Sequence, residues 1–542
     1  MPLRNTPKSF SEEKLKVLIT DGMAKDGLEI LEAATELDID VRKGITKEEL
    51  MEIIGDFEAV IIRSATNLTA DLIEAGTNLK AIGRAGIGVD NVDVEAATKK
   101  GIVVMNTPEA NAITTAEHTI SLMLSLARRI PEAHASLKAG KWERSKFKGI
   151  EIYGKTLGCI GLGNIGKLVA ERAMGLKMNV IAYDPFLTQE AADKIGVELV
   201  SLDELLKRAD VITIHTPLTP DTKDLINKDT FEKTKPGVII VNCARGGVIN
   251  EADIKEAIES GKIAGAAFDV FTTEPVAEDN PILSIEENIV MTPHLGASTA
   301  EAQTKVGLAI AEQIVDFLVN GVVNNAVNMP SVSLEALSVM KPYLNLAEKL
   351  GTLQGQISKG GIKEVHIEYD GEVAELDTPP ITVAALKGFL TPMLDVVVSH
   401  VNAPVIAKER GIKVVESKSS EAKDFTSLIT MKIKTTEGEN QVSGTIFGKE
   451  EPRIVRINGV TIDLVPQGYM LVSENNDRPG FIGSMCTILG DNNVNIGRLH
   501  LGREAIGGRA IVFTNVDSPV PTEVIEQISN LSDIISVAQV KF

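Results

Sequence analysis

Three polar residues each follow an apolar segment that has the pattern of a buried strand. Arg245 comes after GVIIVNCA, Glu274 after AGAAFDV and His294 after NIVMT. Because ligands of open parallel sheets sit at the carboxyl ends of the strands, we expect the three side chains to converge. An arginine can hold a carboxylate, a histidine can exchange a proton with an oxygen, and a carboxylate can orient that histidine. The pattern predicts acid–base chemistry on a small carboxylate.

A glycine-rich loop supplies a second chemical feature. The apolar segment KTLGCI leads directly into GLGNIG, and a helical pattern follows at once. Gly161 permits a tight turn, Gly163 lets a pyrophosphate approach the backbone, and Gly166 lets the helix pack close to the strand. Asp184 ends the next strand, where its carboxylate can bond the ribose hydroxyls and repel a 2′-phosphate. The combination predicts a NAD site.

Each polar residue also has a purely structural interpretation. An arginine before a Gly-Gly pair is a common turn residue, and a histidine after Thr-Pro can cap a strand. For His215, which ends another strand, we favour a structural role beside the glycine loop. No base accompanies Cys243, which favours a small core residue over a nucleophile. His118 and His134 lie on a long helical pattern, where packing or surface positions are expected.

Bulk composition excludes several classes of protein. The 542 residues carry a net charge of −20, which argues against nucleic acid or an anionic membrane as a partner. Three widely separated cysteines show no metal-ligand spacing, so we expect reduced thiols and no metal site. The N-terminal run MPLRNTPKSFSEEK lacks the apolar core of a signal peptide, and no apolar stretch is long enough to span a membrane. We expect a cytoplasmic protein.

The elements that must position these residues form two series of alternating strands and helices. Such alternation predicts parallel sheets with crossover helices. A long helix is expected over 112–139, between the two series. The expected strands are 16–20, 59–64, 79–86 and 102–108 in the first series, and 157–162, 179–184, 211–216, 237–244, 263–270 and 288–293 in the second.

An amphipathic helix predicted over 299–320 starts no new strand series, so we expect it to return to the first domain. The last 75 residues or so alternate as a ferredoxin-like βαββαβ unit. The predicted domains are a discontinuous substrate domain, 1–110 with 294–328; a NAD-binding Rossmann domain, 111–293; an intervening α+β domain, 329–463; and a regulatory domain, 468–542.

Several motifs occur together and in order: GKTLGCIGLGNIG, NCARGG and TPHLGAS, with Asp184, Asp269 and Glu274 between them. Over residues 15–325 the chain resembles the D-isomer-specific 2-hydroxyacid dehydrogenase family. The further runs RSAT, GRAGIGVDNVD, NTPEAN and GKWERSKFKG resemble its phosphoglycerate-oxidising branch, and the C-terminal unit resembles an ACT domain. The resemblance implies a flavodoxin-like substrate domain beside the Rossmann domain. It also implies NAD-dependent oxidation of 3-phospho-D-glycerate to 3-phosphohydroxypyruvate, the first step of L-serine biosynthesis.

The resemblance assigns roles residue by residue. Arg245 binds the substrate, His294 transfers the proton and Glu274 supports that histidine. Beyond the glycine loop and Asp184, the implied NAD site comprises Asn164, Ile165, Thr216, Cys243, Ala244, Asp269, His294 and Gly296. The implied phosphate ligands are Arg63, Ser64 and Asn106.

Assembly and regulation also follow from the resemblance. A homotetramer is expected, and the apolar run 112–129 suggests an interface. Lys141, Trp142 and Arg144 either reach the active site of a neighbouring subunit or form a solvated helix end.

The ACT domain implies serine as an effector, bound near Asp477 and Asn495. Asn475 stands where some relatives carry His or Tyr, and this departure leaves the effector open. Three basic residues ahead of this domain form either an anion site or a solvated strand face: Lys449, Arg453 and Arg456.

Two other functions use the same fold. One is a reductase of glyoxylate or hydroxypyruvate, against which the ACT domain and the implied phosphate ligands argue. The other is a NAD-sensing regulatory protein, such as the related transcriptional corepressors. The C-terminal ACT domain and the absence of a disordered tail argue against the second function.

Overall fold

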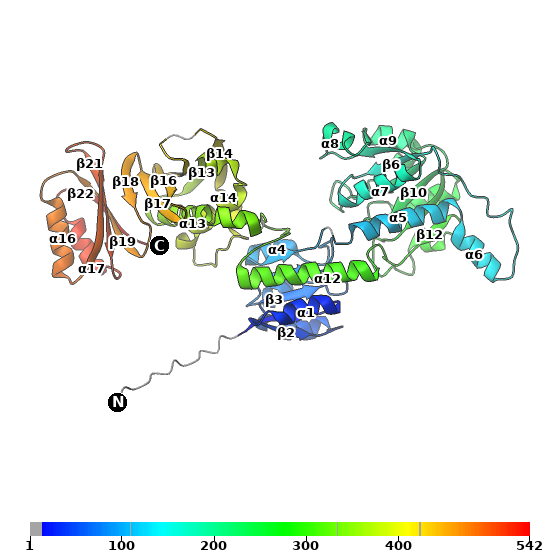
Figure 1. The fold of residues 1–542 in the computed structure, drawn as a ribbon, viewed down its shortest axis with the longest axis horizontal. Coiled ribbons are helices and arrows are strands. Elements are labelled where there is room, and N and C mark those ends of the chain that lie inside the picture. Colours follow the sequence, from blue (N-terminus) through cyan, green and yellow to red (C-terminus); the bar gives the residue numbers. More distant parts are fainter. Residues whose placement is uncertain (1–13, 109, 333, 422–423) are drawn as a thin grey trace, which may run out of the picture.

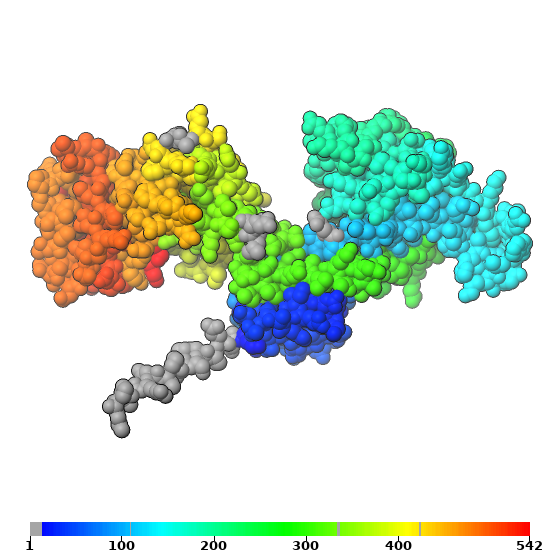
Figure 2. Space-filling model, viewed as in Figure 1, coloured from blue at the N-terminus to red at the C-terminus, as the bar shows by residue number. Residues whose placement is uncertain are grey.

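The structure is a computed structural model that describes residues 14–108, 110–332, 334–421 and 424–542. The remaining positions of the predicted domains lie outside the described residues. The chain forms four lobes, each built on its own sheet (Figure 1). In Figure 2 the cyan second lobe stands apart from the yellow third and orange fourth lobes, which lie against each other and share one hydrophobic core.

The first lobe contains a five-stranded parallel sheet in the order β2-β1-β3-β4-β5. This flavodoxin-like order places a switch point beside β1, where ligands of such sheets bind. Strand β2 is absent from the predicted series, because LDIDV is short and alternates with acids at the sheet edge. The elements are β1 (Leu15–Ile19), α1 (Lys25–Ala33), β2 (Leu37–Val41), α2 (Lys47–Ile53), β3 (Ala59–Ile62), α3 (Ala70–Ala75), β4 (Ala81–Arg84), α4 (Val94–Lys100) and β5 (Val103–Met105).

The second lobe contains a seven-stranded parallel sheet in the order β12-β11-β10-β9-β6-β7-β8. The order reverses at β6, so the Rossmann switch point falls where the glycine loop begins. Its strands are β6 (Thr156–Ile160), β7 (Asn179–Tyr183), β8 (Glu198–Leu199), β9 (Val211–Ile214), β10 (Val238–Asn242), β11 (Ile263–Phe268) and β12 (Ile289–Met291). Its crossover helices are α7 (Asn164–Gly175), α8 (Gln189–Asp193), α9 (Leu202–Arg208), α10 (Lys228–Lys233) and α11 (Glu251–Glu259).

The single helix predicted over 112–139 is wrong. It is two helices, α5 (Ala112–Ala127) and α6 (Ile130–Lys138), because Arg129 takes a left-handed φ of 52° just before Ile130-Pro131. The apolar face of α5 packs on α7, β10 and β11 within the chain. The apolar face of α5 is therefore covered within the chain, and an interface over 112–129 stays a prediction.

Helix α12 (Ala300–Val315) crosses from the second lobe to the first and packs against α1 and β4. Its residues Val306, Ile310 and Ile314 are buried in one core with Val17 and Ile19 of β1. The helix is the green element in the foreground of Figure 1. The chain thus passes twice between these lobes, and the predicted domain bounds stay predictions.

The third lobe has a six-stranded mixed sheet, β14-β13-β15-β16-β17-β18, covered by α13 and α14. Its elements are α13 (Leu334–Ile357), β13 (Ile362–Gly371), α14 (Pro379–Leu390), α15 (Ala403–Glu409), β14 (Lys413–Ser419), β15 (Ser427–Thr435), β16 (Glu439–Phe447), β17 (Glu451–Ile457) and β18 (Val460–Leu464).

The fourth lobe is an antiparallel sheet in the order β20-β21-β19-β22, with two helices. Its elements run β19 (Tyr469–Asn476), α16 (Phe481–Asp491), β20 (Ile496–Arg503), β21 (Arg509–Val516), α17 (Thr522–Ser529) and β22 (Ile534–Lys541). The order βαββαβ confirms the predicted ferredoxin-like unit, and the four sheets together confirm the predicted α/β fold class. No helix in the described stretches is long and apolar enough to cross a membrane.

Candidate active site

The glycine loop has the geometry that the sequence predicts. Gly161 has a φ of 89°, and a side chain at Gly166 would approach the carbonyl oxygen of Gly161 to 2.2 Å. A side chain at Gly163 would meet no atom within 4 Å, so the space before the helix is open. No side chain caps the first turn of α7, which contains Asn164 and Ile165. The N–H groups of that turn therefore suit a phosphate.

Asp184 lies beside this loop, at the end of β7. Its Oδ2 accepts a hydrogen bond from the Leu162 backbone N–H at 2.8 Å, and Oδ1 accepts one from Phe186 N–H at 2.9 Å. The carboxylate therefore fixes the glycine loop. Each carboxylate oxygen has more than one acceptor position, so this role leaves room for ribose hydroxyls.

Orphaned polar atoms line the same region. Thr216 Oγ1 and His215 Nδ1 are buried and have no hydrogen-bond partner among the described residues. Burial lowers the pKa of His215 to about 4, so its imidazole is neutral at working pH. Its Nε2 lies 3.0 Å from Thr213 Oγ1. Buried polar atoms without partners, next to an open glycine face, fit a bound dinucleotide.

The end of β10 carries two of the predicted cofactor residues, Cys243 and Ala244, both buried. Burial raises the pKa of the Cys243 thiol to about 12, which supports the predicted packing role.

Asp269 holds together the loop that carries His294. Only 1% of Asp269 is exposed, and its Oδ1 and Oδ2 accept the backbone N–H groups of Leu295 and Gly296 at 2.7 and 2.8 Å. His118 and Thr292 add side-chain hydrogen bonds to Oδ1. Burial raises the pKa of Asp269, but these hydrogen bonds outweigh it and leave the pKa lowered. His118 therefore does more than pack.

His294 and Glu274 form a direct pair. His294 Nδ1 lies 2.5 Å from Glu274 Oε2, and Glu274 Oε1 accepts a hydrogen bond from the Phe271 N–H at 3.0 Å. The Glu274 hydrogen bond raises the pKa of His294, against a smaller effect of burial. With Nδ1 engaged, Nε2 is the nitrogen left to meet a substrate. The predicted pairing of these two residues is present.

Arg245 extends from the second lobe over the loop that follows β4 of the first. Its Nε donates to Asp90 Oδ2 at 2.9 Å, and its Nη1 donates to the Ala244 carbonyl at 2.6 Å. A side chain at Gly88 would collide with this guanidinium. The arginine therefore bridges the two lobes, and the glycine makes room for it.

A second arginine, Arg84, ends β4 and is not among the residues predicted from the sequence. Burial, together with the charges of Arg245 and Arg63, lowers its pKa to about 10, and the charges of Asp90 and Asp21 oppose this shift. Its Nε is buried and has no partner among the described residues. The three arginines are thus near enough for their charges to interact. The signal available in the sequence is that Arg84 ends a buried strand, as Arg63 directly follows one.

Two other predicted phosphate ligands lie at the same end of the first sheet. Ser64 is exposed just after β3. Asn106, just after β5, donates from Nδ2 to the Ile87 carbonyl at 2.6 Å, which ties it to the loop beneath Arg245. The carboxylate of Asp21 accepts the Arg63 N–H at 2.6 Å and so holds that strand end. Glu109 of the NTPEAN run lies outside the described residues.

Other predicted residues lie apart from this cluster. Lys141, Trp142 and Arg144 are exposed on the segment after α6, which projects from the second lobe (Figure 1). In the fourth lobe, Asp477 Oδ2 accepts from Arg503 Nη1 at 2.9 Å and from Gly507 N–H at 3.1 Å. Asn495 donates to Asp517 Oδ2 at 2.7 Å.

The three basic residues predicted ahead of the fourth lobe are paired or exposed. Arg453 pairs with Glu451 and Asp463, and Arg456 pairs with Asp424, while Lys449 is exposed. These ion pairs support the interpretation as a solvated strand face.

Three family models match the chain in sequence order. The D-isomer specific 2-hydroxyacid dehydrogenase NAD binding domain matches residues 120–296, the D-3-phosphoglycerate dehydrogenase intervening domain matches 339–458, and the ACT domain matches 469–533. The D-3-phosphoglycerate dehydrogenase of Methanocaldococcus jannaschii is 47% identical over 97% of this chain and 99% of its own length. The chain belongs to the D-3-phosphoglycerate dehydrogenase family.

Solved structures share part of this architecture. A glyoxylate reductase from Paecilomyes thermophila is 31% identical with a TM-score of 0.54, and covers 58% of this chain and 98% of its own. The D-lactate dehydrogenase of Aquifex aeolicus, complexed with NAD and lactic acid, is 28% identical with a TM-score of 0.52, and covers 58% of this chain and all of its own. The resemblance inferred from motifs is confirmed, and so is NAD as the cofactor.

Proposed function

We propose that this chain oxidises 3-phospho-D-glycerate to 3-phosphohydroxypyruvate with NAD, as the first step of serine synthesis. The observation that carries the proposal is the position of Arg245, which contacts Asp90 of the first lobe and whose charge acts on both Arg84 and the His294–Glu274 pair, while the charge of Arg63 also acts on Arg84. A substrate that carries both a carboxylate and a phosphate supplies the negative charge that three neighbouring arginines need.

Arg245 binds the substrate carboxylate through its planar fork, in exchange for part of its contact with Asp90. His294 Nε2 takes the proton from the C2 hydroxyl, and Glu274 stabilises the imidazolium that results. NAD held by the glycine loop and Asp184 would supply the acceptor for the hydride that leaves C2. His294 must be neutral before it can accept the proton, so oxidation requires a pH above the pKa of this histidine.

Arg63 and Arg84 hold the phosphate, assisted by Ser64 and Asn106. The buried, unpartnered Nε of Arg84 supports this assignment, because a buried donor without an acceptor is costly unless a ligand supplies one. The glycine loop, Asp184 and Thr216 form the NAD side of the site. Asp269 acts there by fixing the backbone of Leu295 and Gly296.

The phosphate assignment is tested by comparing 3-phospho-D-glycerate with D-glycerate. Arg84→Met should lower kcat/KM for the phosphorylated substrate by about 10- to 150-fold, the loss of a charged hydrogen bond of about 1.5–3 kcal/mol. The same change should leave kcat/KM for D-glycerate within threefold. Arg42→Met is the matched control, because Arg42 is exposed and ion-paired to Asp40 in the same lobe. An equal loss on both substrates would contradict the assignment.

Assembly into a homotetramer is part of the proposal. The segment from α6 onward projects from the second lobe (Figure 1) and exposes Ile130, Leu137, Trp142 and Tyr153, with 77% of Trp142 accessible. Exposed apolar side chains on a projection suit burial by a second copy. This arrangement would bring Lys141 and Arg144 to a neighbouring subunit. Sedimentation should then show an oligomer at micromolar concentration, and Trp142→Glu should weaken it.

Serine is the proposed effector of the fourth lobe, and the cytoplasm is the proposed location. Asp477 lies at the turn into α16, and its ion pair with Arg503 would have to loosen for it to meet an ammonium group.

The reductase alternative is less favoured. The glyoxylate reductase match spans 58% of this chain, whereas the phosphoglycerate-oxidising relative spans 97%.

A further inference from the structure

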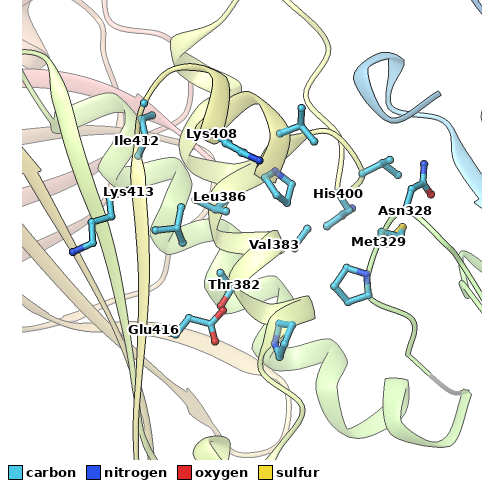
Figure 3. Close-up of a pocket in the computed structure, with 17 residues that line it drawn as sticks. Asn328, Met329, Thr382, Val383, Leu386, His400, Lys408, Ile412, Lys413 and Glu416 are labelled. Atoms are coloured by element: carbon cyan, nitrogen blue, oxygen red, sulfur yellow. The ribbon is translucent and has the colours of Figure 1, made fainter. Parts of the chain in front are cut away.

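A cavity of about 640 Å³ lies where the third lobe meets the segment that leaves the first (Figure 3). Its volume falls in the range of small-molecule sites. Its walls are α14, α15, the start of β14 and residues 328–330. Most of the lining is apolar, and the main apolar residues are Met329, Val383, Leu386, Val401, Val405 and Ile412.

Few charges face this apolar space. Lys413 lies 3.2 Å from Glu364 and points away from the cavity in Figure 3, so its charge is already paired. Glu416 accepts a hydrogen bond from Thr378 Oγ1 at 3.2 Å. Lys408 is exposed, and no carboxylate lies within ion-pair distance of it among the described residues. Figure 3 places Lys408 and Glu416 at opposite ends, so the cavity is cationic at one end only.

His400 contributes a neutral polar group beside residues 328 and 329. Burial lowers its pKa, the charge of Lys387 lowers it further, and Glu348 opposes both. Its Nε2 lies 3.8 Å from the nearer Glu348 oxygen, beyond hydrogen-bond distance. The imidazole can therefore donate to a ligand without carrying a charge.

One wall of the cavity is tied directly to strand β5. Val327 N–H donates to the Val104 carbonyl at 2.8 Å, and Asn328 Oδ1 accepts the Val104 N–H at 3.0 Å. In the same segment, the Asn325 carbonyl accepts the N–H of Asn106 at 3.2 Å. The segment 325–330 therefore lines the cavity at one end and holds the strand that carries Asn106 at the other.

The opposite wall is anchored to the same part of the first lobe. Asn402 Nδ2 donates to the Lys99 carbonyl and Ser399 Oγ donates to the Gly101 carbonyl, both at 3.4 Å. These carbonyls end α4 and precede β5. Both walls of the cavity are therefore hydrogen-bonded to the segment that contains β5.

We propose that this cavity binds a small monocarboxylic acid with an apolar body, and that its occupation shifts β5 and so changes the affinity for 3-phosphoglycerate. The apolar walls take the body, and Lys408 with His400 takes the carboxylate. Glu416 at the far end rejects a second carboxylate. The second half of the proposal rests on the proposed function, because it takes Asn106 as a substrate ligand.

Calorimetry on the full chain tests binding with three probes: octanoate, 1-octanol and suberate. Octanoate should bind. 1-Octanol should bind at least tenfold more weakly than octanoate, and suberate at least fivefold more weakly than octanoate. Lys408→Met should weaken octanoate binding at least tenfold. Lys413→Met is the matched control, because that lysine lines the same cavity but is paired to Glu364, and it should change the affinity less than twofold. Leu386→Trp should fill the cavity and abolish binding.

Undetectable octanoate binding, or equal loss from the two lysine variants, would overturn the site. A second titration measures 3-phosphoglycerate binding with and without saturating octanoate, in the absence of turnover. Coupling between sites predicts an affinity change of about 5-fold or more, which Leu386→Trp should remove. An unchanged affinity would overturn the coupling. If octanoate binds but 3-phosphoglycerate does not, the proposed function fails while the site stands.

Discussion

Replacing Asp269 by asparagine should loosen the loop that carries His294. The buried carboxylate presents one oxygen to each of two backbone donors, Leu295 N–H at 2.7 Å and Gly296 N–H at 2.8 Å. Thr292 Oγ1 donates to the same oxygen as Leu295, at 2.5 Å. An amide has only one acceptor oxygen. Whichever way it turns, its NH₂ group faces a backbone donor.

The magnitude follows from which contacts survive. The amide oxygen should stay on the side of Leu295 and Thr292, where it keeps the larger number of hydrogen bonds. The Gly296 N–H then loses its acceptor inside the protein, and a buried donor left unpaired costs about 1–3 kcal/mol. Because the lost acceptor is charged, we expect about 2–3 kcal/mol of local destabilisation. That corresponds to roughly 30- to 150-fold faster exchange of the Gly296 amide, at 1.4 kcal/mol per factor of ten.

Hydrogen–deuterium exchange of the peptide that spans 292–298 measures this opening directly. Asp93→Asn is the matched control, because Asp93 is an exposed cap of α4 that accepts from the Ala96 N–H, and asparagine caps a helix equally well. Asp269→Asn should also lower kcat/KM at least tenfold, since the imidazole of His294 moves with the loop. Exchange of 292–298 within threefold of the parent protein would refute this account of Asp269.

Four further predictions concern single residues. Asp184→Ala should weaken NAD binding by about 1.5–3 kcal/mol and relax rejection of NADP, as measured by fluorescence titration; an unchanged affinity would remove Asp184 from the ribose site. His294→Ala should lower kcat by about 10²–10⁴-fold with near-normal NAD affinity, and a loss below tenfold would contradict its role as the base. Glu274 raises the pKa of His294, so Glu274→Gln should move the acid limb of kcat/KM for oxidation to lower pH; an unmoved limb would exclude Glu274. Serine should inhibit the intact chain and bind in calorimetry, and Asp477→Ala should abolish that binding; full serine inhibition of a chain that lacks 468–542 would contradict the regulatory role.

The glycine loop could be predicted from sequence because its requirements are local. The positive φ of Gly161 and the close contact at Gly166 are imposed by the turn itself. The pairing of His294 with Glu274 could also be predicted, since both follow strands of one sheet. In each case a short-range pattern or a rule of parallel sheets places the residue.

What the sequence could not show depends on contacts between distant segments. The sequence pattern around Arg84 indicates only the polar end of a strand. Its nearness to other arginines depends on Arg245, which comes from the other lobe. The apolar residues of α5 indicate an interface when only the sequence is considered, because the sequence does not show that α7 and the second sheet cover them. The break between α5 and α6 depends on the left-handed backbone conformation of Arg129, which the hydrophobic periodicity of the sequence does not indicate.

The central claim is hydride transfer from C2 of 3-phospho-D-glycerate to NAD, and isotope transfer tests it most directly. The full chain is incubated with NAD and 3-phospho-D-glycerate that carries deuterium at C2, and the NADH formed is analysed by mass spectrometry. We predict one deuterium in each NADH, and no NADH formation from NAD with D-lactate at the same concentration. Absence of NADH formation, or NADH without deuterium, would contradict it.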